Sequence, residues 1–81
     1  MNLESAKQLF EEILEICYNT ENQQLIDIVN QIYPEIENAQ DVSTIIYSAE
    51  ELQVNINEME FLPEEEDAIQ EMQSKIEKLS E

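Results

Sequence analysis

The chain has 81 residues, of which twenty are acidic and three are lysines, and its formal net charge is −17. It contains no glycine, no histidine and no arginine, which excludes glycine-rich phosphate-binding loops, histidine-dependent proton transfer and the commonest zinc sites. Because proteins bind nucleic acids and anionic membranes through lysine and arginine, this composition argues against direct binding of either.

The length of the chain predicts one small domain over residues 1–81. Hydrophobic residues make up 42% of it and recur regularly, so we expect a folded protein despite the charge. The single cysteine, Cys17, cannot form an intrachain disulfide, which favours a reducing compartment and predicts a cytoplasmic location. No basic neighbour activates Cys17, so we interpret it as a small buried hydrophobe rather than a reactive thiol. We find neither a signal-peptide pattern at the start nor a segment apolar enough to span a membrane.

Residues 3–18 carry apolar side chains at intervals of three and four, which predicts an amphipathic helix. Asn2 is expected to cap its first turn, and Lys7 to pair with Glu4 or Glu11 one turn away. The apolar face consists of Leu3, Ala6, Leu9, Phe10, Ile13, Leu14, Ile16 and Cys17. The opposite face carries Glu4, Glu11, Glu12 and Glu15.

A second helix is predicted over residues 21–38, because residues 20–23 fit a capping box in which Thr20 and Gln23 satisfy first-turn donors. Pro34 lies inside this pattern. Since proline removes a backbone donor and disfavours helical geometry in the preceding residue, we expect the helix to be kinked or restarted there. The apolar face consists of Leu25, Ile28, Val29 and Ile32, widened by Ile26 and Tyr33. Ile36 and Ala39 fall on the same face if the helix continues past Pro34.

Asp41 is the expected cap of a third helix, which should fray or stop between residues 55 and 61 because the alternating, asparagine-rich sequence there favours helix poorly. Its main apolar face consists of Val42, Ile45, Ile46, Ala49, Leu52, Ile56 and Met59.

A second apolar stripe lies off this main face, because Tyr47, Val54 and Phe61 follow one another at seven-residue intervals. Two interpretations are open. Either the third helix touches neighbours on two sides and Phe61 belongs to the following loop, or the stripe is an exposed docking or dimerisation surface.

The last helix is expected to open at Pro63, which suits the first helical position, and to continue with four acids in the first turn, where the helix dipole favours anions. Glu71 and Lys75 are spaced to form an ion pair on one helix face. A narrow apolar seam runs through Ala68, Ile69, Met72, Ile76 and Leu79.

Four amphipathic patterns with short connections predict an all-α fold, a small antiparallel four-helix bundle. The alternative is a three-helix bundle with an irregular segment around Pro34.

The sequence does not favour enzymatic chemistry. Carboxylates are the only candidate ligands or acid–base groups, and with twenty acids the spacing of any pair of them arises by chance. A di-iron bundle needs Glu-x-x-His, which a chain without histidine lacks. We therefore expect no cofactor and no metal site.

The function best matched to this composition is a non-enzymatic interaction module that binds a basic partner protein through its acidic surface. Two alternatives remain open: a nucleic-acid mimic that inhibits a DNA- or RNA-binding protein, and a structural homo-oligomer or small subunit of an assembly. The predicted partner-binding residues are Tyr47, Val54, Glu58, Glu60, Phe61, Glu64, Glu65, Glu66 and Asp67.

The layout of a short helical bundle resembles small bacterial immunity and antitoxin proteins. Phe61-Leu62-Pro63, ahead of the last helix, is similar to the bundles that protect producers of peptide bacteriocins, although those are commonly basic and this chain is acidic. The resemblance implies an inhibitor of a basic protein as a subtype of the interaction module.

Overall fold

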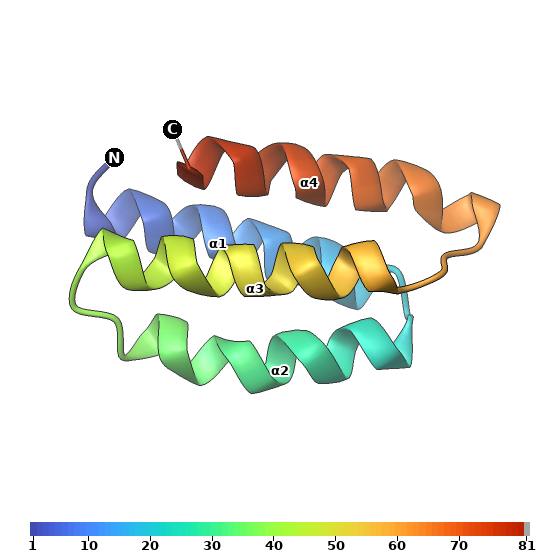
Figure 1. The fold of residues 1–81 in the computed structure, drawn as a ribbon, viewed down its shortest axis with the longest axis horizontal. Coiled ribbons are helices and arrows are strands. Elements are labelled where there is room, and N and C mark those ends of the chain that lie inside the picture. The colour runs from blue at the N-terminus through green and yellow to red at the C-terminus, as the bar shows by residue number, and fades with distance from the viewer. Residues whose placement is uncertain (81) are drawn as a thin grey trace.

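The computed structural model describes residues 1–80 and shows an antiparallel helical bundle (Figure 1). The predicted all-α fold is confirmed, and the bundle measures 35 × 22 × 20 Å. Short loops join the helices, and a single 3₁₀ turn, η1, leads into the last of them. The elements of residues 1–80 are α1 (Leu3–Asn19), α2 (Gln23–Glu37), α3 (Val42–Glu58), η1 (Pro63–Glu65) and α4 (Glu66–Ser80).

The helices are not packed as a square. α1 and α3 contact each other across the bundle, and each also contacts both α2 and α4, whereas α2 and α4 make no contact within residues 1–80. Figure 1 shows the result, with α2 and α4 at opposite edges and α1 and α3 between them. Each central helix therefore has flanking neighbours on two sides and one outer face in solvent.

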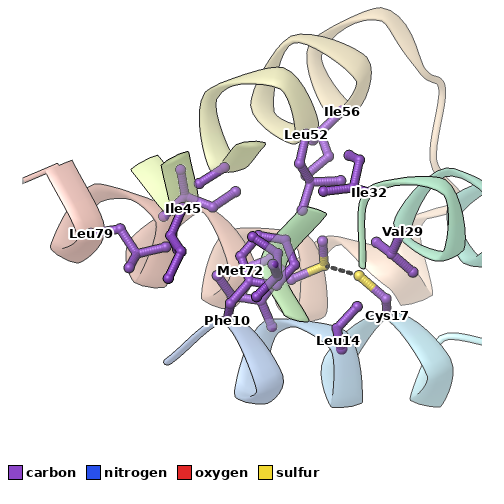
Figure 2. Packing of buried hydrophobic residues seen from close by; sticks show 14 of the residues in the cluster. Phe10, Leu14, Cys17, Val29, Ile32, Ile45, Leu52, Ile56, Met72 and Leu79 are labelled. Atoms are coloured by element: carbon purple, nitrogen blue, oxygen red, sulfur yellow. Dashed lines mark hydrogen bonds between the residues drawn. The ribbon is translucent and has the colours of Figure 1, made fainter. Parts of the chain in front are cut away.

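One hydrophobic core runs between the four helices of residues 1–80 (Figure 2). All four contribute to it, because each carries apolar side chains at helical spacing on one face. Ser48 is buried with them, and its hydroxyl donates to Glu35 Oε2 at 3.0 Å, which ties α3 to α2. The buried apolar residues are Ala6, Phe10, Ile13, Leu14, Cys17, Leu25, Val29, Ile32, Ile36, Ala39, Ile45, Ala49, Leu52, Ile56, Ile69, Met72, Ile76 and Leu79.

Three helices begin at side-chain caps. Asn2, Asn22 and Asp41 each accept a hydrogen bond from the backbone N–H three residues later, at 2.8, 3.1 and 2.9 Å respectively. The backbone N–H of Thr44, together with its hydroxyl, holds the pKa of Asp41 below its usual value. The caps predicted at Asn2 and Asp41 are confirmed.

The predicted capping box at residues 20–23 is wrong. Thr20 ends α1, where its hydroxyl donates to the Cys17 carbonyl at 2.6 Å, and Asn22 caps α2 instead. The two helices are therefore separated by a turn in which Glu21 has φ 58°.

α2 continues through Pro34 as one α-helix, so it does not restart there. The proline ring is exposed, and the helix ends about one turn later, where both the backbone N–H and the side-chain amide of Asn38 donate to the Pro34 carbonyl. Burial of Ile32 and Ile36 on either side of Pro34 keeps the segment helical, because packing of the apolar face outweighs the lost backbone hydrogen bond.

Glu21 is predicted to be a strained position. A left-handed conformation costs a residue with a Cβ atom about 1–2 kcal/mol, and this chain has no glycine with which to make the turn. We expect Glu21→Gly to be more stable than the charge-matched control Glu21→Gln by about 0.5–1 kcal/mol, since glycine also loses more backbone entropy on folding. Urea denaturation of both variants measures the difference. Equal stabilities would show that the strain at this turn is no larger than the entropy that glycine loses on folding.

Cys17 is fully buried, and its Sγ lies 3.6 Å from Met72 Sδ (Figure 2). Burial raises the pKa of this thiol from an ordinary value of 9.0 to about 12. The folded chain thus keeps a neutral thiol where the unfolded chain ionises, which agrees with the prediction of a buried small hydrophobe.

This shift predicts a loss of stability at alkaline pH. Between pH 9 and 12 the unfolded state binds fewer protons at Cys17 than the folded state does, so the free energy of unfolding falls as pH rises. At about pH 10 the wild type should have lost about 1 kcal/mol more than Cys17→Ala, each relative to its own value at about pH 8. Urea denaturation at both pH values measures this, and parallel pH curves for the two proteins would contradict it.

Candidate functional site

The outer face of α3 carries two large exposed apolar side chains. Tyr47 is 71% exposed and Val54 is 57% exposed, and both line a shallow hollow together with residues of the same helix. Seven residues separate them, which is about two helical turns or ~10.5 Å along the axis. The remaining residues of the hollow are Glu50, Glu51 and Asn55.

A groove of about 600 Å³ lies between α3 and α4 beside this face. Val54 belongs to both the groove and the hollow, so the two form one continuous surface. Ile76 adds a second apolar group from α4, although its side chain is mostly buried. The residues lining the groove are Glu50, Gln53 and Val54 from α3 and Ile76, Glu77 and Ser80 from α4. We call the hollow and the groove together the α3 surface.

Phe61 does not continue the stripe of Tyr47 and Val54. α3 ends at Glu58, and the chain turns into extended backbone at Met59, so the position two turns beyond Val54 is never reached. Phe61 lies instead in the loop before η1, half-buried and packed against the core. Phe61 thus belongs to the loop after α3, as the first interpretation of the stripe expects. Tyr47 and Val54 are exposed, as the second interpretation, a docking or dimerisation surface, requires.

Glu65 differs from the other acidic residues predicted to bind a partner, because its carboxylate accepts two hydrogen bonds within the fold. Its Oε1 accepts from the backbone N–H of Leu62 at 2.9 Å, and its Oε2 accepts from the Asn22 side-chain amide at 3.2 Å. It thereby joins η1, which leads into α4, to Asn22, the residue that caps α2. The other acidic residues predicted to bind a partner are all exposed: Glu58, Glu60, Glu64, Glu66 and Asp67.

Lys7 makes a different contact from the one predicted. Its Nζ donates to the carbonyl oxygen of Glu37, at the end of α2, at 3.3 Å. The sequence could only suggest partners on the same helix, Glu4 and Glu11. The backbone carbonyls at the end of a helix carry partial negative charge, and packing of α1 against α2 brings this end within reach.

Lys75 pairs between helices rather than with Glu71. Its Nζ lies 3.6 Å from Glu12 Oε1, so the acidic face of α1 receives a cation from α4. α2 and α3 contain no basic residue at all. No lysine from residues 1–80 lines the α3 surface, and the ion pair found within these residues, between Lys75 and Glu12, lies outside it.

The described part of the chain offers no set of three metal-ligating side chains that converge on one point. None of the helices over residues 1–80 combines the length and the apolar character needed to cross a membrane. The α3 surface offers contact area and charge.

Three acidic residues of this surface are not among the partner-binding residues predicted from the sequence. Glu50 and Glu51 follow Tyr47 at three and four residues, and this spacing alone places them beside it on a helix. Glu77 lies far away in sequence, and only the packing of α4 against α3 brings it to the groove.

Comparisons with known proteins give no further guide to this site. No protein-family model, curated protein or solved structure matches the chain significantly. The resemblance to immunity and antitoxin bundles therefore stays a prediction from the layout of the helices.

Proposed function

We propose that this chain is a non-enzymatic interaction module that binds a basic partner protein through the α3 surface. The supporting observation is the exposure of Tyr47 and Val54 on one helix face, surrounded by carboxylates that no lysine neutralises. Protein interfaces commonly combine an apolar centre with a polar rim, and tyrosine is enriched among residues that contribute most binding energy.

The charge of the chain supports a basic partner in particular. A net charge of −17 on 81 residues produces a strong negative potential, which accelerates the approach of a cationic protein and repels acidic ones. Complex formation should therefore be fast and sensitive to salt. An inhibitor or immunity- or antitoxin-like protein that covers the active surface of a basic protein is the subtype we favour.

The test starts with capture of proteins from a source-cell lysate on the immobilised chain, followed by purification of the basic protein that is retained. We expect its affinity to fall by about tenfold to a hundredfold when Tyr47→Ala and Val54→Ala are combined, because the apolar centre of the interface is removed. The matched control is Tyr18→Ala, which removes an exposed tyrosine from α1. Isothermal titration calorimetry measures all three affinities.

The same experiment distinguishes the alternatives. Equal affinity for the α3 variant and the Tyr18→Ala control would overturn the assignment to the α3 surface. Displacement of the chain from its partner by DNA would favour the nucleic-acid mimic. Light scattering that detects oligomers of the chain alone, with no retained partner, would favour the structural role.

A further inference from the structure

We infer that the partner contributes a single amphipathic α-helix with cationic flanks, and that this helix lies along α3 in the groove between α3 and α4. The inference rests on the proposed function and adds to it the kind of element that is bound. Three features of the α3 surface carry it: the spacing of its apolar groups, the placement of its carboxylates and the absence of a sheet edge from residues 1–80.

The spacing of Tyr47 and Val54 suits a helix. Their separation of about 10.5 Å is matched by two residues seven apart on a partner helix, which lie on the same face. In an extended strand the same distance spans about three residues, and side chains three apart point to opposite faces. A strand would also find no backbone partner, because residues 1–80 form no sheet to which it could add.

The carboxylates specify the flanks of the bound helix. Glu50 on α3 and Glu77 on α4 line the groove from its two helices, and the apolar groups of Val54 and Ile76 line it with them. A helix seated there meets a carboxylate on each side of its apolar seam. Lysine or arginine next to that seam would pair with both, which makes the expected ligand cationic as well as amphipathic.

A second copy of this chain is a poor occupant of the groove. Two copies would each bring a net charge of −17. In a two-fold dimer the same patch faces itself, so Glu50 and Glu51 would lie near their own equivalents without any lysine between them. Repulsion between these carboxylates opposes association of two copies, whereas a cationic helix would be attracted to them.

The test uses two synthetic peptides of about 18 residues, long enough to form a helix on a surface. One has leucines at positions i, i+3 and i+7 flanked by lysines, and the other has the same composition in an order that destroys the apolar face. Fluorescence anisotropy at about 0.15 M salt should show at least about tenfold tighter binding of the amphipathic peptide. Circular dichroism should show that it becomes helical on binding.

The location is tested independently by NMR. On addition of the amphipathic peptide, backbone amide shifts should change along residues 47–54 and 76–80 and not on the outer face of α1. Val54→Ser, and separately Glu50→Gln with Glu77→Gln, should each weaken binding about fivefold or more. Glu11→Gln with Glu15→Gln on α1 is the matched charge control and should have a smaller effect. All four glutamates are exposed, so the glutamine variants should keep the fold.

The outcomes separate this inference from the proposed function. Equal binding of the two peptides, or shift changes confined to α1, would overturn the bound helix or its location. The proposed function would still stand if the purified partner loses affinity on Tyr47→Ala with Val54→Ala. Insensitivity of that partner to the same pair of substitutions would overturn the proposed function, whatever the peptides do.

Discussion

Phe10→Ala is expected to lower the free energy of unfolding by about 3–5 kcal/mol. Phe10 is fully buried in the core at the centre of α1, and it is one of two phenylalanines in the chain. Truncating a buried phenylalanine costs about 3–5 kcal/mol, from lost apolar burial and from the cavity that remains. A domain of this size has a total stability of only about 4–12 kcal/mol, so the loss is a large part of it.

Urea denaturation followed by circular dichroism measures this loss. Phe61→Ala is the matched control, because Phe61 is only half-buried at the end of the core and should cost clearly less. Unfolding of Phe10→Ala at nearly the same urea concentration as the wild type would contradict this prediction. It would mean that the core around α1 rearranges to fill the space left by the ring.

The fold could be predicted from the sequence to a large extent, because apolar periodicity and capping residues act locally. The intervals of three and four in residues 3–18 fix the buried face of α1, and Asn2 and Asp41 satisfy backbone donors only three residues away. The prediction of Thr20 as the cap of α2 was wrong, because the side chains of Thr20 and Asn22 can both cap a helix. The choice between them depends on the left-handed turn at Glu21. A glycine would normally mark such a turn in a sequence, and this chain has none.

Contacts between side chains of different helices could not be predicted from the sequence. Lys75 has an acidic neighbour on its own helix and yet pairs with Glu12 on α1, because side-by-side packing of α1 and α4 brings the two groups together. Local spacing identifies partners on one helix only, and it gives no information on which helices become neighbours.

The candidate site was predictable in part for the same reason. Tyr47 and Val54 fall off the main apolar face, and this is visible from helical spacing alone. Phe61 appeared to extend them only under the assumption that the helix continued, whereas α3 ends at Glu58. Glu77 entered the site through packing of α4. The offset arrangement of the four helices, with α3 between α2 and α4, explains why α3 has a free outer face at all.

Salt is expected to stabilise the fold strongly. The chain carries twenty acids and three lysines, and the bundle that residues 1–80 form is only 35 Å long, so many carboxylates are close neighbours. Two like charges about 10 Å apart repel by about 0.4 kcal/mol in water, and the folded state holds many such pairs at fixed distances. Going from about 10 mM to about 1 M NaCl shortens the screening length from about 30 Å to about 3 Å, which should raise the free energy of unfolding by on the order of 2–4 kcal/mol.

Urea is the suitable denaturant for this measurement, because it carries no charge and leaves the screening unchanged. The control is a variant in which Glu50, Glu51, Glu58 and Glu77 are replaced by glutamine. It should be more stable than the wild type at low salt and should gain less from added NaCl, since fewer repelling pairs remain to be screened. Equal salt dependence in both proteins would mean that NaCl acts through general salting-out rather than through screening of charge. If the wild type gained nothing from salt, its carboxylates would not repel one another enough to favour a cationic partner, and the electrostatic basis of the proposed function would be lost.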